Sequence, residues 1–249
     1  MKGLVKGYGK GEKVVFIAGA GGNTRAWYFQ RNGLQNFMEV MLMELPGHGQ
    51  DKEGQGLDSI EGYRDYVHAA LQDLGIDSCY MVGHSMGGAI AMSFALTYSQ
   101  MLEGIVLITT GAKLKVSPEI LKGLKADKEK AVRMIIEYGF SKGAPQQLKE
   151  EGFKDMMECR TEVIYNDFMA CERFDIMDRV KEIRTPTLII CGKEDILAPP
   201  AYSEYLHSNI QGSRLIVVEG AGHMVILEKP DEVNRAIKDF VLNRSLNRG

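Results

Sequence analysis

A serine set among small residues is the sharpest chemical signal in the sequence. Residues 83–88 read Gly-His-Ser-Met-Gly-Gly, directly after the apolar run 80–82 and directly before a helical pattern that opens at Met86. A serine at such a strand-to-helix turn must take strained backbone angles, and small neighbours let the adjacent chain approach. The turn would expose the Ser85 hydroxyl beside a helix amino end, which stabilises a developing oxyanion. Gly-x-Ser-x-Gly alone also occurs by chance, as an ordinary glycine-rich turn.

Candidate partners for Ser85 follow along the chain, each after its own apolar run. Asp195 follows residues 187–191, and His223 follows residues 215–219. A serine alcohol is a weak nucleophile at neutral pH, so a histidine must take its proton and a buried carboxylate must orient that histidine. The order serine, acid, histidine predicts a catalytic triad of Ser85, Asp195 and His223. Glu194 is the alternative acid, and a solvent-facing loop histidine is the alternative interpretation of His223.

A glycine-rich loop after the first apolar run offers the second half of an oxyanion hole. Residues 18–23 read Ala-Gly-Ala-Gly-Gly-Asn, without the Gly-x-Gly-x-x-Gly spacing of a dinucleotide site. Glycines let such a loop approach a substrate carbonyl, so we expect the backbone N–H groups of Ala20 and Met86 to be the two donors. Substrate contacts are expected from residues near these loops: Gly19, Gly21, Trp27, His84 and Met224.

The remaining histidines have structural interpretations. His84 adjoins the serine, but neighbouring strand positions point to opposite faces, so packing beside the turn is the alternative to a substrate contact. His48 lies in a Leu-Pro-Gly-His-Gly turn and is expected to fix that loop. His68 and His207 fall on helical patterns and are expected at the surface.

Short apolar runs alternate with helical patterns, which is typical of βαβ crossovers in one α/β domain. The runs predict buried strands of a mostly parallel sheet at residues 14–18, 40–44, 80–84, 105–109, 187–191 and 215–219. Flanking helices are predicted at residues 27–36, 60–74, 86–98, 202–208 and 232–242.

Residues 117–180 break this alternation, because they hold helical stretches, many charges and methionines, and no convincing strand. We interpret them as a helical cap inserted into a core of residues 1–116 and 181–249. A cap over the carboxyl edge of the sheet would shape a substrate pocket there. Its methionines could line an adaptable apolar pocket or simply pack under the cap; they include Met134, Met156, Met157, Met169 and Met177.

The composition is that of an ordinary globular protein. Of 249 residues, 45% are apolar and 25% charged, and the formal net charge of -3 predicts no strong field for nucleic acid or anionic lipid. The four cysteines show no metal-ligand spacing, so no metal site is expected, and they fit a reducing compartment. The apolar run 14–18 is too short for a secretory signal, and no segment approaches the roughly 20 apolar residues of a membrane span. We therefore expect a cytoplasmic monomer or homodimer that acts on a small molecule.

Taken together, the chain resembles the α/β-hydrolase family along nearly its whole length, especially the small capped carboxylesterases and related acyl hydrolases. The resemblance rests on four segments in order: residues 16–22, 44–49, 83–88, and the pair 192–195 with 222–224. It implies an about eight-stranded sheet, hydrolysis through an acyl-enzyme and no cofactor. Most relatives carry a histidine that helps to hold the oxyanion loop, where this chain has Ala18. The amino end before Val14 is also short, so the first family strands are expected to be abbreviated.

The resemblance implies hydrolysis of a carboxylic ester. Because residues 117–180 hold no obvious cluster of arginines for a dianionic substrate, we expect a neutral, fairly apolar ester of short to medium acyl length. The same triad in this family also cleaves carbon–carbon bonds of ring-fission products, monoacylglycerols, thioesters and lactones. Epoxide hydrolases and haloalkane dehalogenases of this fold use an aspartate nucleophile, so Ser85 argues against both. A non-catalytic small-molecule receptor on the same fold is the alternative from another class.

Overall fold

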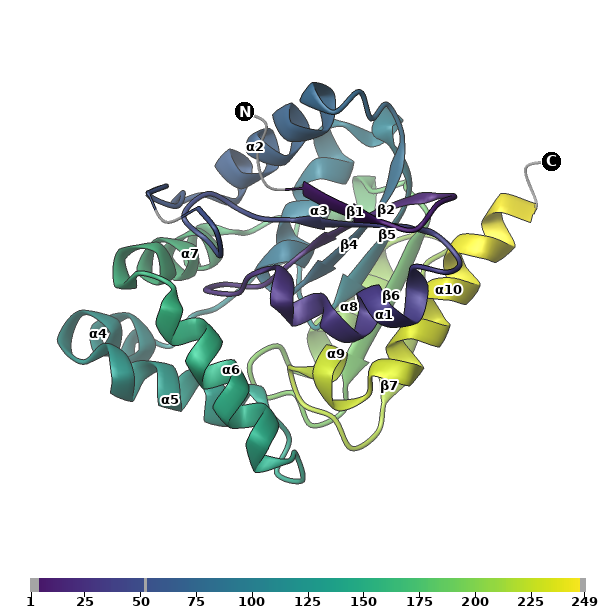
Figure 1. The fold of residues 1–249 in the computed structure, drawn as a ribbon. Coiled ribbons are helices and arrows are strands. Elements are labelled where there is room, and N and C mark those ends of the chain that lie inside the picture. Colours follow the sequence, from purple (N-terminus) through teal and green to yellow (C-terminus); the bar gives the residue numbers. More distant parts are fainter. Residues whose placement is uncertain (1–4, 52, 247–249) are drawn as a thin grey trace.

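A seven-stranded sheet forms the centre of the computed structural model, which describes residues 5–51 and 53–246 (Figure 1). In sheet order the strands are β1 (Val5–Tyr8), β3 (Glu39–Met43), β2 (Lys13–Ile17), β4 (Cys79–His84), β5 (Leu102–Ile108), β6 (Thr187–Gly192) and β7 (Arg214–Val218). Strand β1 is antiparallel to β3, and the other pairs are parallel. The mostly parallel α/β sheet is confirmed. The strand number is seven in the described residues instead of about eight, because one short strand, β1, precedes β2 there.

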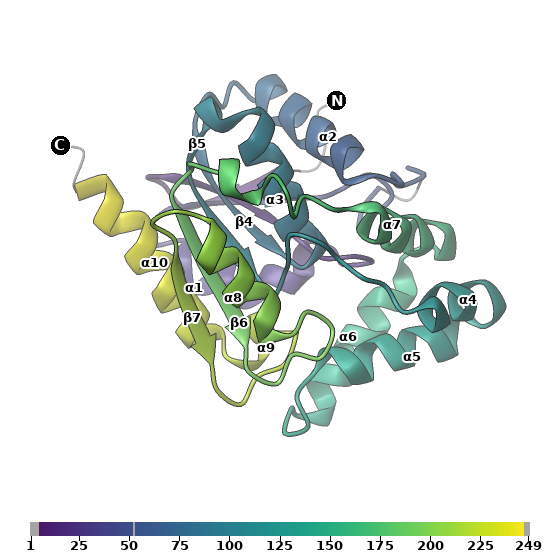
Figure 2. The same ribbon diagram turned by 180° about the vertical axis from the view of Figure 1, so that it is seen from behind.

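Helices cover both faces of the sheet, as Figures 1 and 2 show from opposite sides. One face packs against α2 (Ile60–Asp73), α3 (Met86–Thr97) and α8 (Pro200–Asn209), and the other against α1 (Tyr28–Leu34), α9 (Val225–Glu228) and α10 (Pro230–Leu246). Successive strand residues point to opposite faces, so Val15 and Ile17 join the first layer while Val14 and Phe16 join the second. Burial on both faces explains why the strands appear in the sequence as continuous apolar runs.

Four further helices follow β5 and precede β6. They are α4 (Pro118–Ala126), α5 (Lys128–Gly139), α6 (Gln146–Glu158) and α7 (Thr161–Arg173), and they gather to one side of the sheet (Figures 1 and 2). Their apolar faces form a hydrophobic cluster of their own, centred on Val132, Phe140 and Val163. These are the residues that the sequence predicts to form a helical cap.

Helix α3 begins in close contact with two strands, and small residues make that contact possible. A Cβ at Gly83 would lie 2.1 Å from the carbonyl oxygen of Gly87, and a Cβ at Gly87 would lie 2.2 Å from that of Ile17. The helix is buried along Met86–Ala95. Its first turn is therefore fixed by backbone packing against β2 and β4.

Gly87→Ala should destabilise the fold, because the added methyl group must push the start of α3 away from β2. Overpacking of this kind costs roughly 1–3 kcal/mol of unfolding free energy. Urea denaturation followed by circular dichroism measures the change. Gly143→Ala is the matched control, since a Cβ there meets nothing within 4 Å. Equal urea midpoints for the two variants would contradict the close approach.

Candidate active site

Ser85 lies at the turn between β4 and α3 in a backbone conformation that few residues with a side chain adopt. Its φ is 54° and its ψ is -117°, in a region that costs of order 1–3 kcal/mol. Neighbouring groups hold the turn: the Ser85 N–H donates to Ile108 O at 2.9 Å, and Ser85 O accepts from the Gly88 N–H at 2.9 Å and the Thr110 hydroxyl at 2.8 Å. The strained turn that the sequence predicts is present.

Asp195 and His223 form a buried pair. His223 Nδ1 lies 2.8 Å from Asp195 Oδ2, and Asp195 Oδ1 accepts from the backbone N–H groups of Leu197 at 2.8 Å and Ala198 at 2.9 Å. Because three N–H groups converge on the carboxylate, it fixes the imidazole with its proton on Nδ1. His223 Nε2 is then available to accept a proton. Asp195, and not Glu194, makes this contact.

The backbone of His223 is held as firmly as its ring. Its carbonyl oxygen lies 2.9 Å from His84 Nε2 and 3.1 Å from Thr109 Oγ1. Since a carbonyl only accepts, His84 carries its proton on Nε2. Burial, helped by the nearby His223, lowers the pKa of His84 to about 3. His84 is therefore neutral at physiological pH and packs beside the turn, where it also borders the cavity described next.

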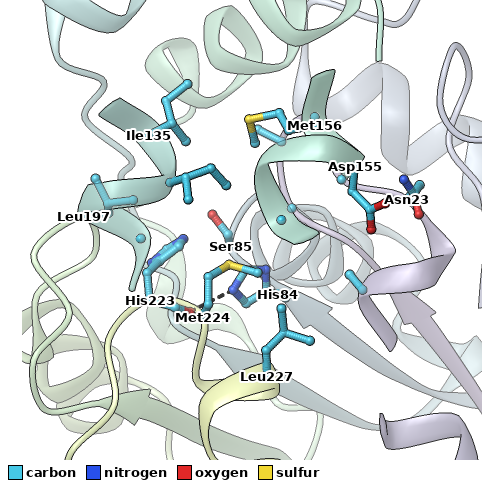
Figure 3. Close-up of a pocket in the computed structure, with 18 of the residues that line it drawn as sticks. Asn23, His84, Ser85, Ile135, Asp155, Met156, Leu197, His223, Met224 and Leu227 are labelled. Atoms are coloured by element: carbon cyan, nitrogen blue, oxygen red, sulfur yellow. Dashed lines mark hydrogen bonds between the residues drawn. The ribbon is translucent and has the colours of Figure 1, made fainter. Parts of the chain in front are cut away.

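Ser85 and His223 face one cavity of about 900 Å³ (Figure 3). Figure 3 shows Ile135 and Met156 on one side of Ser85 and Met224 on the other. Its wall is mostly apolar, and side chains from α5, α6, α7, α9 and the loops between later elements contribute to it: Ile135, Ile136, Leu148, Met156, Phe168, Leu197, Met224 and Leu227. Charged side chains also line it, among them Lys6, Arg25, Arg31 and Asp155. In the part of the chain that the structure describes, no hydrogen bond joins the Ser85 hydroxyl to His223.

The structure brings most of the predicted substrate contacts to this cavity. Gly19, Gly21, His84 and Met224 line it, as does Ala20 of the predicted oxyanion hole. Met86 is buried at the start of α3. Trp27 lies away from the cavity, fully buried edge-on against Phe16 and His84. Its large apolar ring is used in the core between the sheet and α1, so the expected substrate contact is not found.

The glycine-rich loop after β2 reaches Ser85 closely. A Cβ at Gly19 would lie 3.1 Å from Ser85 Cβ and 3.1 Å from His84 Nδ1, closer than an ordinary van der Waals contact. The Gly22 N–H donates to Gly19 O at 3.0 Å and closes a tight turn around Ala20. This loop therefore lies where a donor to a substrate carbonyl would be needed.

Some contacts of the site lie outside the predicted set. The Thr109 hydroxyl donates to the His223 carbonyl, and the Thr110 hydroxyl donates to the Ser85 carbonyl. Both threonines directly follow β5, the strand next to β4. Their position directly after this strand is the sequence signal from which they could have been predicted. His48 fixes its loop as expected, with Nδ1 3.0 Å from Pro46 O. Its other nitrogen bonds Asp167 of α7, for which no sequence signal exists.

The described residues offer no cluster of three histidine, cysteine or acidic side chains that could hold a metal ion. Within the same residues, no helix is long and apolar enough to cross a membrane.

Residues 14–236 match the alpha/beta hydrolase family, and the chain belongs to it. Pimeloyl-(acyl-carrier protein) methyl ester esterase from Neisseria meningitidis is 28% identical over 244 residues, which cover 92% of this chain and 93% of that protein. A 2-hydroxy-6-oxo-6-phenylhexa-2,4-dienoate hydrolase from Comamonas testosteroni is 26% identical over 260 residues, covering 95% and 90% of the two chains. A solved thermophilic esterase is 34% identical with a TM-score of 0.84, covering 96% of this chain and 94% of its own.

The low pKa of His84 makes folding stability depend on pH. Below pH 6.5, the ordinary pKa of histidine, His84 binds a proton in the unfolded chain. In the folded chain it does so only near pH 3. The unfolding free energy should therefore fall as pH drops through this window, by up to about 1.4 kcal/mol per pH unit from this group. His84→Gln keeps an N–H donor for His223 O and cannot titrate.

Urea denaturation between pH 7.5 and 4.5 tests this dependence. On acidification, the unfolding free energy of the wild type should fall more steeply than that of His84→Gln. The difference between the two slopes should approach the value for one proton, about 1.4 kcal/mol per pH unit. Parallel pH dependences would mean that His84 titrates normally in the folded protein.

Proposed function

We propose that this hydrolase cleaves neutral, fairly apolar carboxylic esters of short to medium acyl chain, with Ser85 as nucleophile, His223 as base and Asp195 as the supporting acid. The observation that carries the proposal is the meeting of two features at one cavity. Ser85 is held there on a strained turn, and His223 is oriented there by Asp195. A histidine so oriented can take the proton that makes a serine nucleophilic.

In the proposed mechanism, Ser85 Oγ attacks the ester carbonyl carbon while His223 Nε2 takes the hydroxyl proton. The N–H groups of Ala20 and Met86 stabilise the resulting oxyanion, for which one donor is worth about 10²–10³ in kcat. Collapse of the tetrahedral intermediate transfers the proton from His223 to the leaving alcohol and leaves an acyl-serine. Water, deprotonated by His223, then releases the acid and restores Ser85. Asp195 stays ionised and stabilises the imidazolium throughout.

The cavity wall supports an apolar substrate. We propose that residues 117–180 form a cap over a core of residues 1–116 and 181–249, so that α5 and α6 place Ile135 and Met156 beside Ser85. About 900 Å³ lies in the usual range for small-molecule pockets. Of the cap methionines, Met156 lines the cavity, Met134 and Met157 pack in the α4–α7 cluster, and Met177 is exposed. A cytoplasmic location and a monomeric or homodimeric state stay predictions.

Carbon–carbon hydrolysis of a ring-fission product is a second candidate. The Comamonas testosteroni relative is named as a dienoate hydrolase, and Lys6 and Arg31, which line the cavity, could receive a carboxylate. The same serine, histidine and aspartate would serve both reactions, so substrate tests must separate them.

Ser85→Ala should remove ester hydrolysis almost completely, by several orders of magnitude in kcat, because the triad members act as a unit. The assay is steady-state turnover of p-nitrophenyl acetate, butyrate, octanoate and palmitate, with equal thermal unfolding of the two proteins as the check on folding. Wild-type turnover should favour the short and medium esters. Retained activity in Ser85→Ala would remove Ser85 from the mechanism. A single slow acylation without turnover would favour a receptor.

Asp195→Asn should lower kcat for the preferred ester by about 10²–10⁴, because an amide can present its NH₂ to His223 and favour the wrong tautomer. Glu194→Gln is the matched control, since Glu194 is adjacent in sequence and exposed. It should keep wild-type kcat. The opposite ranking of the two variants would assign the acid to Glu194.

A further inference from the structure

Asp167 is a carboxylate on α7 with no exposed surface, and it bonds three segments that are distant in sequence. Its Oδ2 accepts from the Gly21 N–H at 2.7 Å and lies 2.7 Å from His48 Nε2. Its Oδ1 accepts from the Tyr63 hydroxyl. One side chain of α7 thus ties together the glycine-rich loop after β2, the loop after β3, and α2.

The protonation of this cluster follows from its partners. His48 Nδ1 faces the Pro46 carbonyl at 3.0 Å, which can only accept, and Nε2 faces the carboxylate. Burial alone would lower the pKa of His48, but the charge and hydrogen bond of Asp167 outweigh it and the pKa is raised. Burial also raises the pKa of Tyr63, which therefore donates as a neutral phenol. Because both ring nitrogens of His48 face acceptors, His48 pairs with Asp167 as an imidazolium with a carboxylate, and this buried pair carries little net charge.

Pairing matters because of where Asp167 lies. The Gly21 N–H belongs to the peptide plane directly after Ala20, the proposed oxyanion donor. An unpaired negative charge on the carboxylate, so close to the loop, would oppose an oxyanion developing at the Ala20 N–H. With His48 protonated beside it, the carboxylate can hold the loop without that penalty.

The residue at the start of the loop cannot hold it by a side-chain hydrogen bond. Ala18 is buried and packs against the loop, where a Cβ at Gly22 would lie 3.3 Å from its methyl group, but a methyl group forms no hydrogen bond.

We propose that Asp167 is a positioning residue that sets the oxyanion loop through Gly21, so that the geometry of the Ala20 donor depends on the seating of α7. This inference rests on the proposed function, in which Ala20 donates to the oxyanion. It makes α7 part of the catalytic apparatus as well as a wall of the cavity.

Asp167→Asn tests the proposal, with Glu162→Gln as the matched control, because Glu162 is an exposed carboxylate on the same helix. The asparagine keeps the size but removes the charge and one acceptor. For the preferred p-nitrophenyl ester, kcat should fall about 10–10³-fold with KM within about threefold, as for loss of a contact made in the transition state. Affinity for a trifluoromethyl ketone, which forms a tetrahedral adduct with the serine, should fall by a similar factor. Glu162→Gln should match the wild type in all three quantities.

A purely structural Asp167 would lower the unfolding temperature and leave kcat and ketone affinity of the folded protein unchanged, and that result would overturn the proposal. If Asp167→Asn does not fold, His48→Gln replaces it: glutamine can still donate to Asp167 but carries no charge, so kcat and ketone affinity should again fall together. Wild-type values in His48→Gln would count against the proposal equally. If Ser85→Ala is inactive and Asp167→Asn is fully active, only the positioning role of Asp167 is ruled out. If Ser85→Ala is active, the proposed function itself is ruled out.

Discussion

The backbone of Ser85 is the constraint on which the rest of the site depends. A serine with φ of 54° persists only where its surroundings enforce it. Here Ile108 of β5 accepts from the Ser85 N–H, and the Thr110 hydroxyl donates to the Ser85 carbonyl. The small residues at 83 and 87 let β4, α3 and β2 come into backbone contact. The same contact brings the glycine-rich loop after β2 next to the serine. The ends of three neighbouring strands are thus joined at one point by main-chain interactions, before any functional side chain is considered.

Two buried pairs of histidine and aspartate flank this point, and they differ in one respect. In both, a carboxylate with little or no exposed surface accepts hydrogen bonds at each oxygen. The second ring nitrogen of His223 faces the cavity, whereas the second ring nitrogen of His48 is hydrogen-bonded to the Pro46 carbonyl. The first pair can therefore exchange a proton with a bound molecule. The second can only hold parts of the chain together, because both of its nitrogens are occupied.

The sequence predicted those features that local chemistry dictates. Parallel strands buried on both faces appear as apolar runs, and the serine, acid and histidine each follow such a run, so strand and loop positions could be inferred together. Strand β1 was not predicted, because Val5–Tyr8 is a half-exposed edge strand without an apolar run. Trp27 was expected at the substrate because it lies near the loop in sequence, but a helical turn directs its ring into the core. The link between Asp167 and His48 spans 119 residues and exists only through tertiary packing, which no local pattern encodes.

The order of these elements along the chain also bears on how the protein is made. The strained serine and the loop beside it lie within the first 90 residues, whereas the proposed acid and base follow β6 and β7, the last two strands at one edge of the sheet. Domains generally fold as units during synthesis, so the sheet is completed only after β6 and β7 have been made. A serine without its base is a poor nucleophile. On the proposed assignment of the base, a growing chain carries no activated hydroxyl until the carboxyl-terminal strands complete the sheet.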